Sequence, residues 1–247
     1  MAASNLSDDA FLGGRINLLQ PKLGFRAGLD AVVLAAAVDA HERQFVCDLG
    51  AGVGTAGLCL AARVAGLHIT AVEIDVSLAG LANLNFERNR LKGSFEVLQA
   101  DVFERPKSLP RQGFHHVITN PPFYDAAKGT VAPDGVTARA KAIDGPALIQ
   151  WLKFARALVR PKGVLTMIIP PAQLPTALET VTRTGLGVQI TPLWPRAGEP
   201  AKRLILRAQM NSNAPMQLHA GLALHDQSGK PSRAAEEILR EGKALTT

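Results

Sequence analysis

The chain has 247 residues, 47% of them hydrophobic and 19% charged, which is typical of a soluble globular protein with one large α/β domain or two small ones. Lys and Arg number 27 against 21 Asp and Glu, so the formal net charge is +6. A basic excess favours a polyanionic partner, although a surface that merely happens to be basic is the alternative.

The sequence gives no sign of a membrane or secretion signal. The longest apolar run, Leu29–Val38, is too short for a span and contains Asp30, and the first nine residues are polar and acidic. Both cysteines, Cys47 and Cys59, lie in apolar segments without a zinc-ligand pattern. We therefore expect a cytoplasmic protein with no metal and no membrane contact.

The first 43 residues predict a small addition to the main domain. Residues 1–10 are expected to be a disordered tail, residues 11–18 a hairpin around Gly13-Gly14, residues 20–26 a loop and residues 29–39 a helix. The hairpin and helix, residues 11–43, are expected to pack on the core. Arg26 and Asp30 lie where the loop becomes the helix, so capping or a mutual salt bridge is the simplest interpretation of both.

From Gln44 onward, strand-like and helix-like segments alternate, which predicts a single α/β domain over residues 44–247. We expect a Rossmann-like, seven-stranded, mostly parallel sheet with helices on both faces. Residues 124–145 are expected to be a long loop, and residues 161–163 a turn. A short strand and a last helix over residues 234–240 should follow Met210. The expected strands are residues 45–49, 68–73, 95–100, 114–119, 164–169, 187–193 and 203–209, and the expected helices are residues 54–65, 76–90, 147–158 and 174–184.

A glycine-rich stretch, Asp48-Leu49-Gly50-Ala51-Gly52-Val53-Gly54, follows the first of these strands and opens a helix. Glycines let the backbone approach a ligand closely, and a helix N-terminus favours negative charge. Gly52, Gly54 and Gly57 also satisfy G-x-G-x-x-G, with Glu73 placed to bind a ribose as in dinucleotide enzymes. The motif alone leaves two ligand classes open.

Three features favour S-adenosylmethionine over a dinucleotide. Asp48 precedes the first glycine, where a carboxylate suits a cationic amino-acid ligand better than a pyrophosphate. Asp101 ends the third strand, where it can accept from an adenine amino group, and an Asn-Pro-Pro-Phe turn ends the fourth. All these positions fall at carboxyl ends of strands, where open parallel sheets bind ligands. The alternative is that the acids are helix caps.

The Asn-Pro-Pro-Phe turn comprises Asn120, Pro121, Pro122 and Phe123. Proline fixes φ and restricts the preceding residue, so we expect the Asn120 side chain and the carbonyls of Asn120 and Pro121 to face outward as acceptors. Phe123 adds a flat face. Such a turn suits a planar group that bears an amine, although an ordinary proline turn is the alternative.

This ordered set resembles class I S-adenosylmethionine-dependent methyltransferases, and Asn-Pro-Pro-Phe narrows the likeness to amino-methylating enzymes. The stretches 8–15, 20–21, 24–26, 29–31 and 192–203 resemble the tRNA adenine-N6 methyltransferase family that acts on valine tRNA. The resemblance covers roughly residues 8 to 240. Phe123 departs from the tyrosine often found in that position, and Arg26 stands where several relatives carry other residues.

The resemblance implies roles for particular residues. The methionine end of the cofactor would lie near Asp48 and Gly50, its ribose on Glu73 and its adenine beside Asp101. Asn120 and Pro121 would accept the N–H bonds of the target amine, in a turn stiffened by Pro122, and Phe123 would stack on the base. Further cofactor contacts are expected from Arg26, Asp30, Ala51, Gly52, Gly54, Ile74, Val102 and Asn120. Phosphate contacts are expected from Arg26, Arg139, Lys141, Lys202 and Arg203.

The resemblance implies an RNA partner, with tRNA expected first, and a monomer or weak dimer. Guanine-N2 methylation of ribosomal RNA and methylation of a protein glutamine amide remain alternatives, as does an RNA- or nucleotide-binding module without catalysis. A nicotinamide oxidoreductase is disfavoured because the sequence lacks a proton-relay set such as Tyr-x-x-x-Lys.

Overall fold

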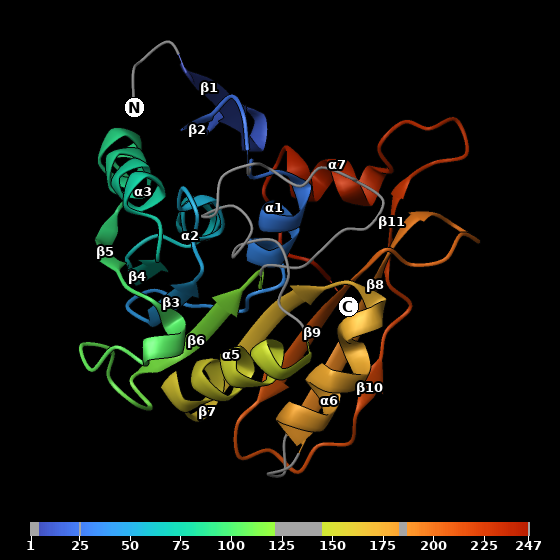
Figure 1. Ribbon diagram of the computed structural model, residues 1–247. Coiled ribbons are helices and arrows are strands. Elements are labelled where there is room, and N and C mark those ends of the chain that lie inside the picture. The colour runs from blue at the N-terminus through green and yellow to red at the C-terminus, as the bar shows by residue number, and fades with distance from the viewer. Residues whose placement is uncertain (1–4, 25, 122–144, 183–186, 247) are drawn as a thin grey trace.

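A nine-stranded sheet forms the centre of the molecule (Figure 1) in the computed structural model, which describes residues 5–24, 26–121, 145–182 and 187–246. Eight strands follow the order β10-β8-β9-β7-β6-β3-β4-β5, and β11 also pairs with β8. β9 is antiparallel to β7 and β8, and all other pairings in this sheet are parallel. Its strands are β3 Phe45–Leu49, β4 Leu67–Glu73, β5 Gly93–Gln99, β6 Phe114–Thr119, β7 Val159–Ile169, β8 Gly187–Arg196, β9 Arg203–Gln209, β10 Gln217–Leu218 and β11 Leu222–His225.

The seven strands expected from the sequence are all present, so the Rossmann-like, mostly parallel sheet is confirmed. The sheet is nevertheless larger than expected, since two short strands, β10 and β11, add to β8 where one was expected. β7 also begins earlier than expected and continues through residues 161–163. A register shift opposite Phe114 and His116, and a positive φ of 64° at Lys162, absorb the turn as an irregularity within the strand.

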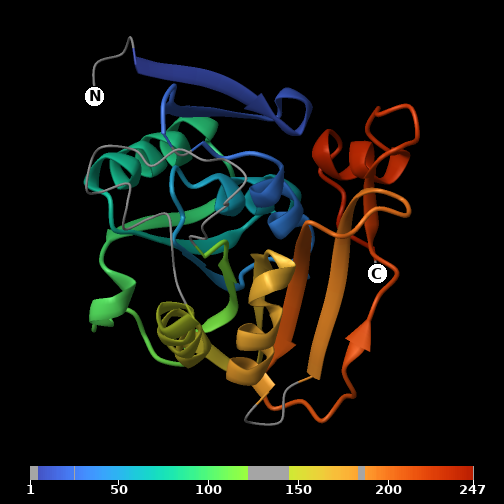
Figure 2. The ribbon, with the colours of Figure 1, turned by 45° about the vertical axis from the view of Figure 1, so that its right-hand side comes forward.

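Helices cover both faces of the sheet (Figures 1 and 2). Parallel strands in such a fold are buried on both sides, so neighbouring residues of one strand enter different cores. In β3, Val46 packs on the side of α1 and α2, and Cys47 on the side of α5 and α6. The described helices are α1 Leu29–Ala36, α2 Thr55–Arg63, α3 Val76–Asn89, α5 Gly145–Leu158, α6 Leu174–Thr182 and α7 Arg233–Leu239.

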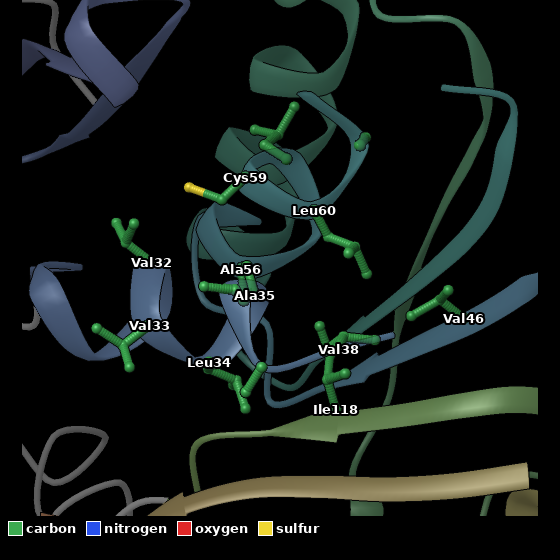
Figure 3. Close-up of a cluster of buried hydrophobic side chains, with 14 of the residues drawn as sticks. Val32, Val33, Leu34, Ala35, Val38, Val46, Ala56, Cys59, Leu60 and Ile118 are labelled. Carbon is green, nitrogen blue, oxygen red and sulfur yellow. The ribbon is translucent and has the colours of Figure 1, made fainter. Parts of the chain in front are cut away.

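The core on the side of α1 and α2 consists of small and branched aliphatic side chains (Figure 3). Val33 and Leu34 of α1 and Leu60 of α2 are completely buried, as is Ile118 of β6. Cys59 of α2 lies in this core, whereas Cys47 lies in the opposite one, and both thiols are free. No helix within the described ranges is long and apolar enough to cross a bilayer.

The N-terminal residues form a strand rather than a tail. β1 (Leu6–Phe11) pairs antiparallel with β2 (Ile16–Pro21), so the disordered tail predicted over residues 1–10 is wrong for residues 6–10, and Gln20 and Pro21 belong to a strand instead of a loop. The predicted turn is correct, since Leu12–Gly14 forms a 3-10 turn between the strands. Partners distant in the chain hold the hairpin: Asp8 pairs with Arg88 of α3 at 2.6 Å.

Candidate active site

Four polar side chains lie at the carboxyl ends of adjacent strands. Asp48 lies in β3, Glu73 ends β4, Asp101 follows β5 and Asn120 follows β6, and these strands are neighbours in the order β6-β3-β4-β5. The registers align these ends, since Leu49 is opposite both Val72 and Thr119. The fold therefore gathers residues 48 to 120 of the chain at one edge of the sheet.

Asp48 is a buried carboxylate with only 2% of its surface exposed. Its Oδ2 accepts a hydrogen bond from the backbone N–H of Gly57 at 3.0 Å, within the first turns of α2. Burial raises the pKa of Asp48 to about 7, the Gly57 N–H opposes this rise, and the negative charge of Glu73 adds to it. A cation placed beside Asp48 would favour its charged form, so the residue suits a positively charged ligand.

Glu73 organises the backbone around it with both carboxylate oxygens. Oε2 accepts from Gly52 N at 2.7 Å, and Oε1 accepts from Ile74 N at 2.9 Å and from Asp75 N at 3.0 Å. These bonds tie the end of β4 to the glycine-rich loop that follows β3. Oε1 already accepts two bonds, whereas Oε2 accepts one and retains a lone pair, so Glu73 can also accept from a ligand hydroxyl.

The glycine-rich loop has a backbone that other residues would strain. Gly50 has φ 75°, and a Cβ there would lie 3.0 Å from the Trp151 ring. Gly54 has φ 83° and lies against Phe86 of α3. The N–H groups of Gly50 and Ala51 both donate to the Val72 carbonyl at 2.9 Å, which fixes the loop to β4. These contacts explain the glycines at 50 and 54.

Asp101 caps a 3-10 turn, Val102–Glu104, with its Oδ1 accepting from Phe103 N at 2.8 Å. The capping alternative weighed from the sequence thus holds for this acid, although its second oxygen remains available. Val102 is buried, whereas Ile74 is half exposed at the same edge of the sheet.

Asn120 has a buried side-chain oxygen. The Oδ1 atom is out of reach of solvent and has no hydrogen-bond partner among the described residues. The expectation that this oxygen faces outward is therefore wrong: Oδ1 is enclosed, although Asn120 as a whole, directly after the central strand β6, is only partly buried. Pro121 is buried. An unpaired buried acceptor costs about 1–3 kcal/mol, so a missing donor is the natural explanation.

Trp151 is a residue of this site that the sequence analysis missed. It lies in α5, with its indole Nε1 donating to Thr119 Oγ1 at 3.0 Å, and Thr119 donates to the Leu49 carbonyl at 2.8 Å. Its ring also packs beside Gly50. It contacts the Phe103 ring edge-on, with 5.9 Å between the two ring centroids. The sequence indicates a site role for Trp151 only weakly, because it is a single aromatic residue among the apolar residues of a helix.

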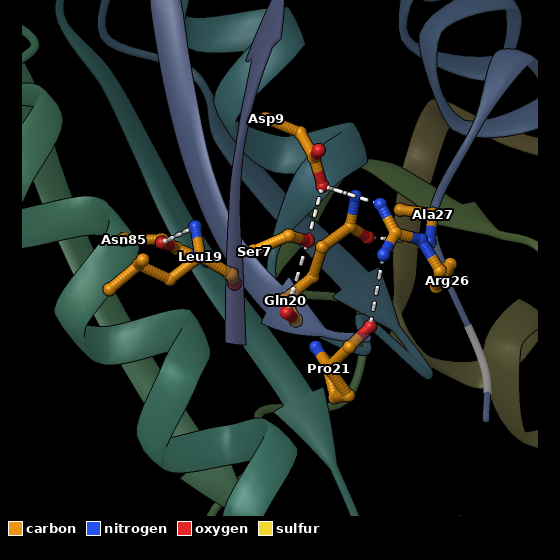
Figure 4. Close-up of polar contacts among 8 residues, drawn as sticks. All are labelled: Ser7, Asp9, Leu19, Gln20, Pro21, Arg26, Ala27 and Asn85. Carbon is orange, nitrogen blue, oxygen red and sulfur yellow. Dashed lines mark hydrogen bonds and ion pairs between the residues drawn. The ribbon is translucent and has the colours of Figure 1, made fainter. Parts of the chain in front are cut away.

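Arg26 and Asp30 do not pair with each other. Arg26 binds Asp9 of β1 at 2.7 Å, and Gln20 binds the same carboxylate oxygen at 2.7 Å (Figure 4). Asp30, in the first turn of α1, pairs instead with Arg203 of β9 at 2.9 Å. The predicted mutual salt bridge is therefore wrong, because both partners meet residues that only the tertiary fold brings near.

Of the residues expected to bind RNA, three are described: Arg26, Lys202 and Arg203. Lys202 is exposed at the tip between β8 and β9, and Arg203 is engaged with Asp30. The remaining site residues predicted from the sequence, Pro122, Phe123, Arg139 and Lys141, lie outside the described residues.

The chain matches the family model of the methyltransferase small domain over residues 27–144. A crystal structure from Agrobacterium tumefaciens, described as a predicted O-methyltransferase, is 28% identical with a TM-score of 0.69, and the match covers 88% of this chain and 98% of that chain. A Thermus thermophilus 16S rRNA N2-guanine methyltransferase in complex with AdoMet and guanosine has the same fold, with a TM-score of 0.58 at 22% identity over 83% of this chain and 50% of its own. The chain is thus a methyltransferase with the class I Rossmann-like fold.

Similarity to two curated relatives extends over nearly the whole chain. A Shewanella baltica protein named tRNA1(Val) (adenine(37)-N6)-methyltransferase is 25% identical over 235 residues, which are 94% of this chain and 98% of the relative. A Vibrio vulnificus protein of the same name is 26% identical, over 92% of this chain and 93% of its own length. The resemblance stated from the sequence motifs is therefore confirmed.

Proposed function

We propose that this protein transfers a methyl group from S-adenosylmethionine to an exocyclic base amine in RNA, adenine N6 of tRNA being the leading target. The names of the Shewanella and Vibrio relatives support this target. The observation that carries the proposal is the buried Asn120 Oδ1, which has no hydrogen-bond partner within the described residues.

An exocyclic amine is the donor that Asn120 lacks. The nitrogen of such an amine carries two N–H groups but is a poor nucleophile, because its lone pair is delocalised into the ring. Asn120 Oδ1 and the Pro121 carbonyl would each accept one N–H, orienting the nitrogen and stabilising the positive charge that it develops. No strong base is needed, since the alkylated nitrogen becomes acidic and releases a proton afterwards.

The strand ends beside Asn120 suit S-adenosylmethionine, which supplies an electrophilic methyl group when it is bound. Asp48 is a buried acid at the edge where a cationic ligand would lie. Glu73 Oε2 keeps a lone pair for a ribose hydroxyl, and Asp101 Oδ2 accepts no bond within the described residues and would take an adenine amine. Gly50 lets the glycine-rich loop pack directly against the Trp151 ring. We assign the cofactor to these residues, with Ala51, Gly52, Gly54, Ile74 and Val102 around it.

The tip between β8 and β9 is our candidate for RNA backbone contacts. β8 runs parallel to β7 and β6 through the sheet, so its carboxyl end lies at the same edge as Asn120. Three strand spacings separate β6 from β8, about 14 Å at ~4.8 Å each. Arg196 pairs with Glu199 and Arg203 with Asp30, whereas no ion pair is found for Lys202 within the described ranges.

A hollow of about 600 Å³ lies at the same tip, where Ala197, Gly198, Glu199 and Pro200 form part of its lining. The Trp194 indole, whose Nε1 donates to the Ala220 carbonyl at 3.0 Å, forms one wall. Gly221 also lines it. An aromatic wall suits stacking by an unpaired base.

The test is methyl transfer from radiolabelled S-adenosylmethionine to total bacterial RNA, which is then digested to nucleosides and separated. We expect label in N6-methyladenosine from the tRNA fraction. Label in N2-methylguanosine from ribosomal RNA would move the target to guanine, and the absence of label from all RNA would remove RNA as the substrate. If the wild-type protein does not bind S-adenosylmethionine in calorimetry, the enzyme assignment fails.

The variant Asn120→Ala tests the observation that carries the proposal. It should abolish turnover while the dissociation constant of S-adenosylmethionine stays within a few-fold, because Asn120 is assigned chiefly to the amine. Retained turnover would remove Asn120 from the mechanism.

A further inference from the structure

Two asparagines of α3 bind the N-terminal hairpin in the same way. Asn85 Oδ1 accepts from Leu19 N at 2.8 Å while its Nδ2 donates to Leu19 O at 3.0 Å. Asn89, one turn later, accepts from Asn17 N and donates to Asn17 O, both at 2.9 Å. Each side-chain amide thus accepts from the N–H and donates to the C=O of one β2 residue. A third strand paired with β2 would make the same two bonds through its backbone.

Only Asn85 reaches the glycine-rich loop. Its Nδ2 also donates to the Val53 carbonyl at 3.0 Å, whereas Nδ2 of Asn89 donates to the Asn85 carbonyl within α3. Asn85 is 0% exposed and Val53 2% exposed, so the Val53 carbonyl cannot turn to water if this bond is lost. Both asparagines therefore bind the hairpin, but only Asn85 also binds the glycine-rich loop.

Val53 lies between the two glycines whose backbone shapes the candidate cofactor site. Gly52 N donates to Glu73 Oε2 at 2.7 Å, and Gly54 lies against Phe86, the residue after Asn85. The loop is thus held by Glu73 on one side and by α3 on the other. A shift of the Val53 carbonyl would move the N–H of Gly54 and the start of α2 with it, because they are adjacent in the chain.

We propose that Asn85 is a positioning residue for the cofactor loop, and that through it the β1–β2 hairpin and the glycine-rich loop are coupled. Figure 4 shows Asn85 meeting Leu19 from α3, while Gln20, the next residue of β2, meets Asp9 and the Ala27 N–H. The same strand therefore connects the loop at Val53 with the segment that leads into α1. The proposal rests on the cofactor assignment made above and adds a residue that does not touch the cofactor.

The experiment compares Asn85→Ala with Asn89→Ala. Both variants lose a clamp on β2, so both should unfold at a lower temperature than the wild type. Only Asn85→Ala leaves the Val53 carbonyl unpaired, and we expect it to raise the dissociation constant of S-adenosylmethionine about tenfold, with Asn89→Ala within about twofold of the wild type. Calorimetry gives the dissociation constants, and thermal unfolding gives the stabilities.

A measurement on the wild-type protein covers the case in which Asn85→Ala does not fold. Amide hydrogen exchange with and without S-adenosylmethionine should show slower exchange at Leu19 N, which is bound to Asn85, and no change at Asn17 N, which is bound to Asn89. Equal changes at Leu19 and Asn17, or equal dissociation constants for the two variants, would overturn the coupling. Absence of cofactor binding by the wild type would instead overturn the proposed function.

Discussion

Replacing Asp48 by asparagine should stabilise the free protein and weaken its cofactor binding. The Asp48 side chain is buried, and burial together with the charge of Glu73 raises its pKa from 3.8 to about 7, against the effect of the Gly57 N–H. An asparagine oxygen can still accept that N–H, so the substitution removes the charge and keeps the bond. The aspartate is then a case in which a functional charge destabilises the fold.

The sign and size of this change in stability follow from the pKa of Asp48 in the unfolded and folded states, 3.8 and about 7. An acid whose pKa is higher in the folded state holds its proton more tightly there, so its favourable contribution is complete below pH 3.8 and is lost as the pH rises through about 7. At ~1.4 kcal/mol per pKa unit, the charge of Asp48 costs the fold about 4 kcal/mol at pH 8 and about 2 kcal/mol at pH 5. Asp48→Asn should therefore gain more stability at pH 8 than at pH 5.

Urea unfolding of both proteins between pH 5 and pH 8 measures this difference, and calorimetry at pH 8 measures the dissociation constant of S-adenosylmethionine. Glu96 on β5, exposed, provides a matched control: Glu96→Gln removes a carboxylate without a buried charge and should change neither quantity. A stability difference between Asp48→Asn and wild type that does not vary with pH would refute the reasoning. So would an unchanged dissociation constant.

The other predictions concern the residues around Asp48. Glu73→Ala leaves the Gly52, Ile74 and Asp75 N–H groups without their acceptor, and should weaken cofactor binding in calorimetry; an unchanged dissociation constant would show that the ribose assignment is wrong. Trp151→Phe keeps a ring near Gly50 but removes the donor to Thr119, so unfolding in urea should become easier by about 1–3 kcal/mol, and equal stability would exclude a structural role for that bond. Lys202→Ala should lower the salt slope of RNA binding by about 1 in filter-binding assays without altering cofactor affinity, and an unchanged slope would remove Lys202 from the interface.

The sequence predicted the sheet well because its central strands are short, largely apolar segments between turn residues. β3 and β6 have the predicted bounds, and the strand ends with Asp48, Glu73, Asp101 and Asn120 meet at one edge as parallel topology requires. In such segments, local pattern and final environment agree, so one window of sequence is sufficient.

The elements that the sequence could not predict depend on distant partners. β1 is polar and short, and it is a strand because β2 pairs with it and Arg88 binds Asp8 from 80 residues away. Arg203 meets Asp30 across 173 residues. No local window contains both members of such a pair, so the strand was taken for a tail and the salt bridge was assigned to the wrong partner.

The two free cysteines provide a way to observe each face of the sheet separately. Cys59 belongs to α2 and lies in the core on the side of α1 and α2, whereas Cys47 of β3 lies in the core on the side of α5 and α6. Burial raises the pKa of both thiols, that of Cys59 to about 12, with the charge of Asp48 adding to the effect in each case. A protonated, enclosed thiol does not react with alkylating reagents, so each cysteine becomes labelled only when its own layer opens. The unmodified chain therefore carries a natural reporter of local opening for each of its two cores.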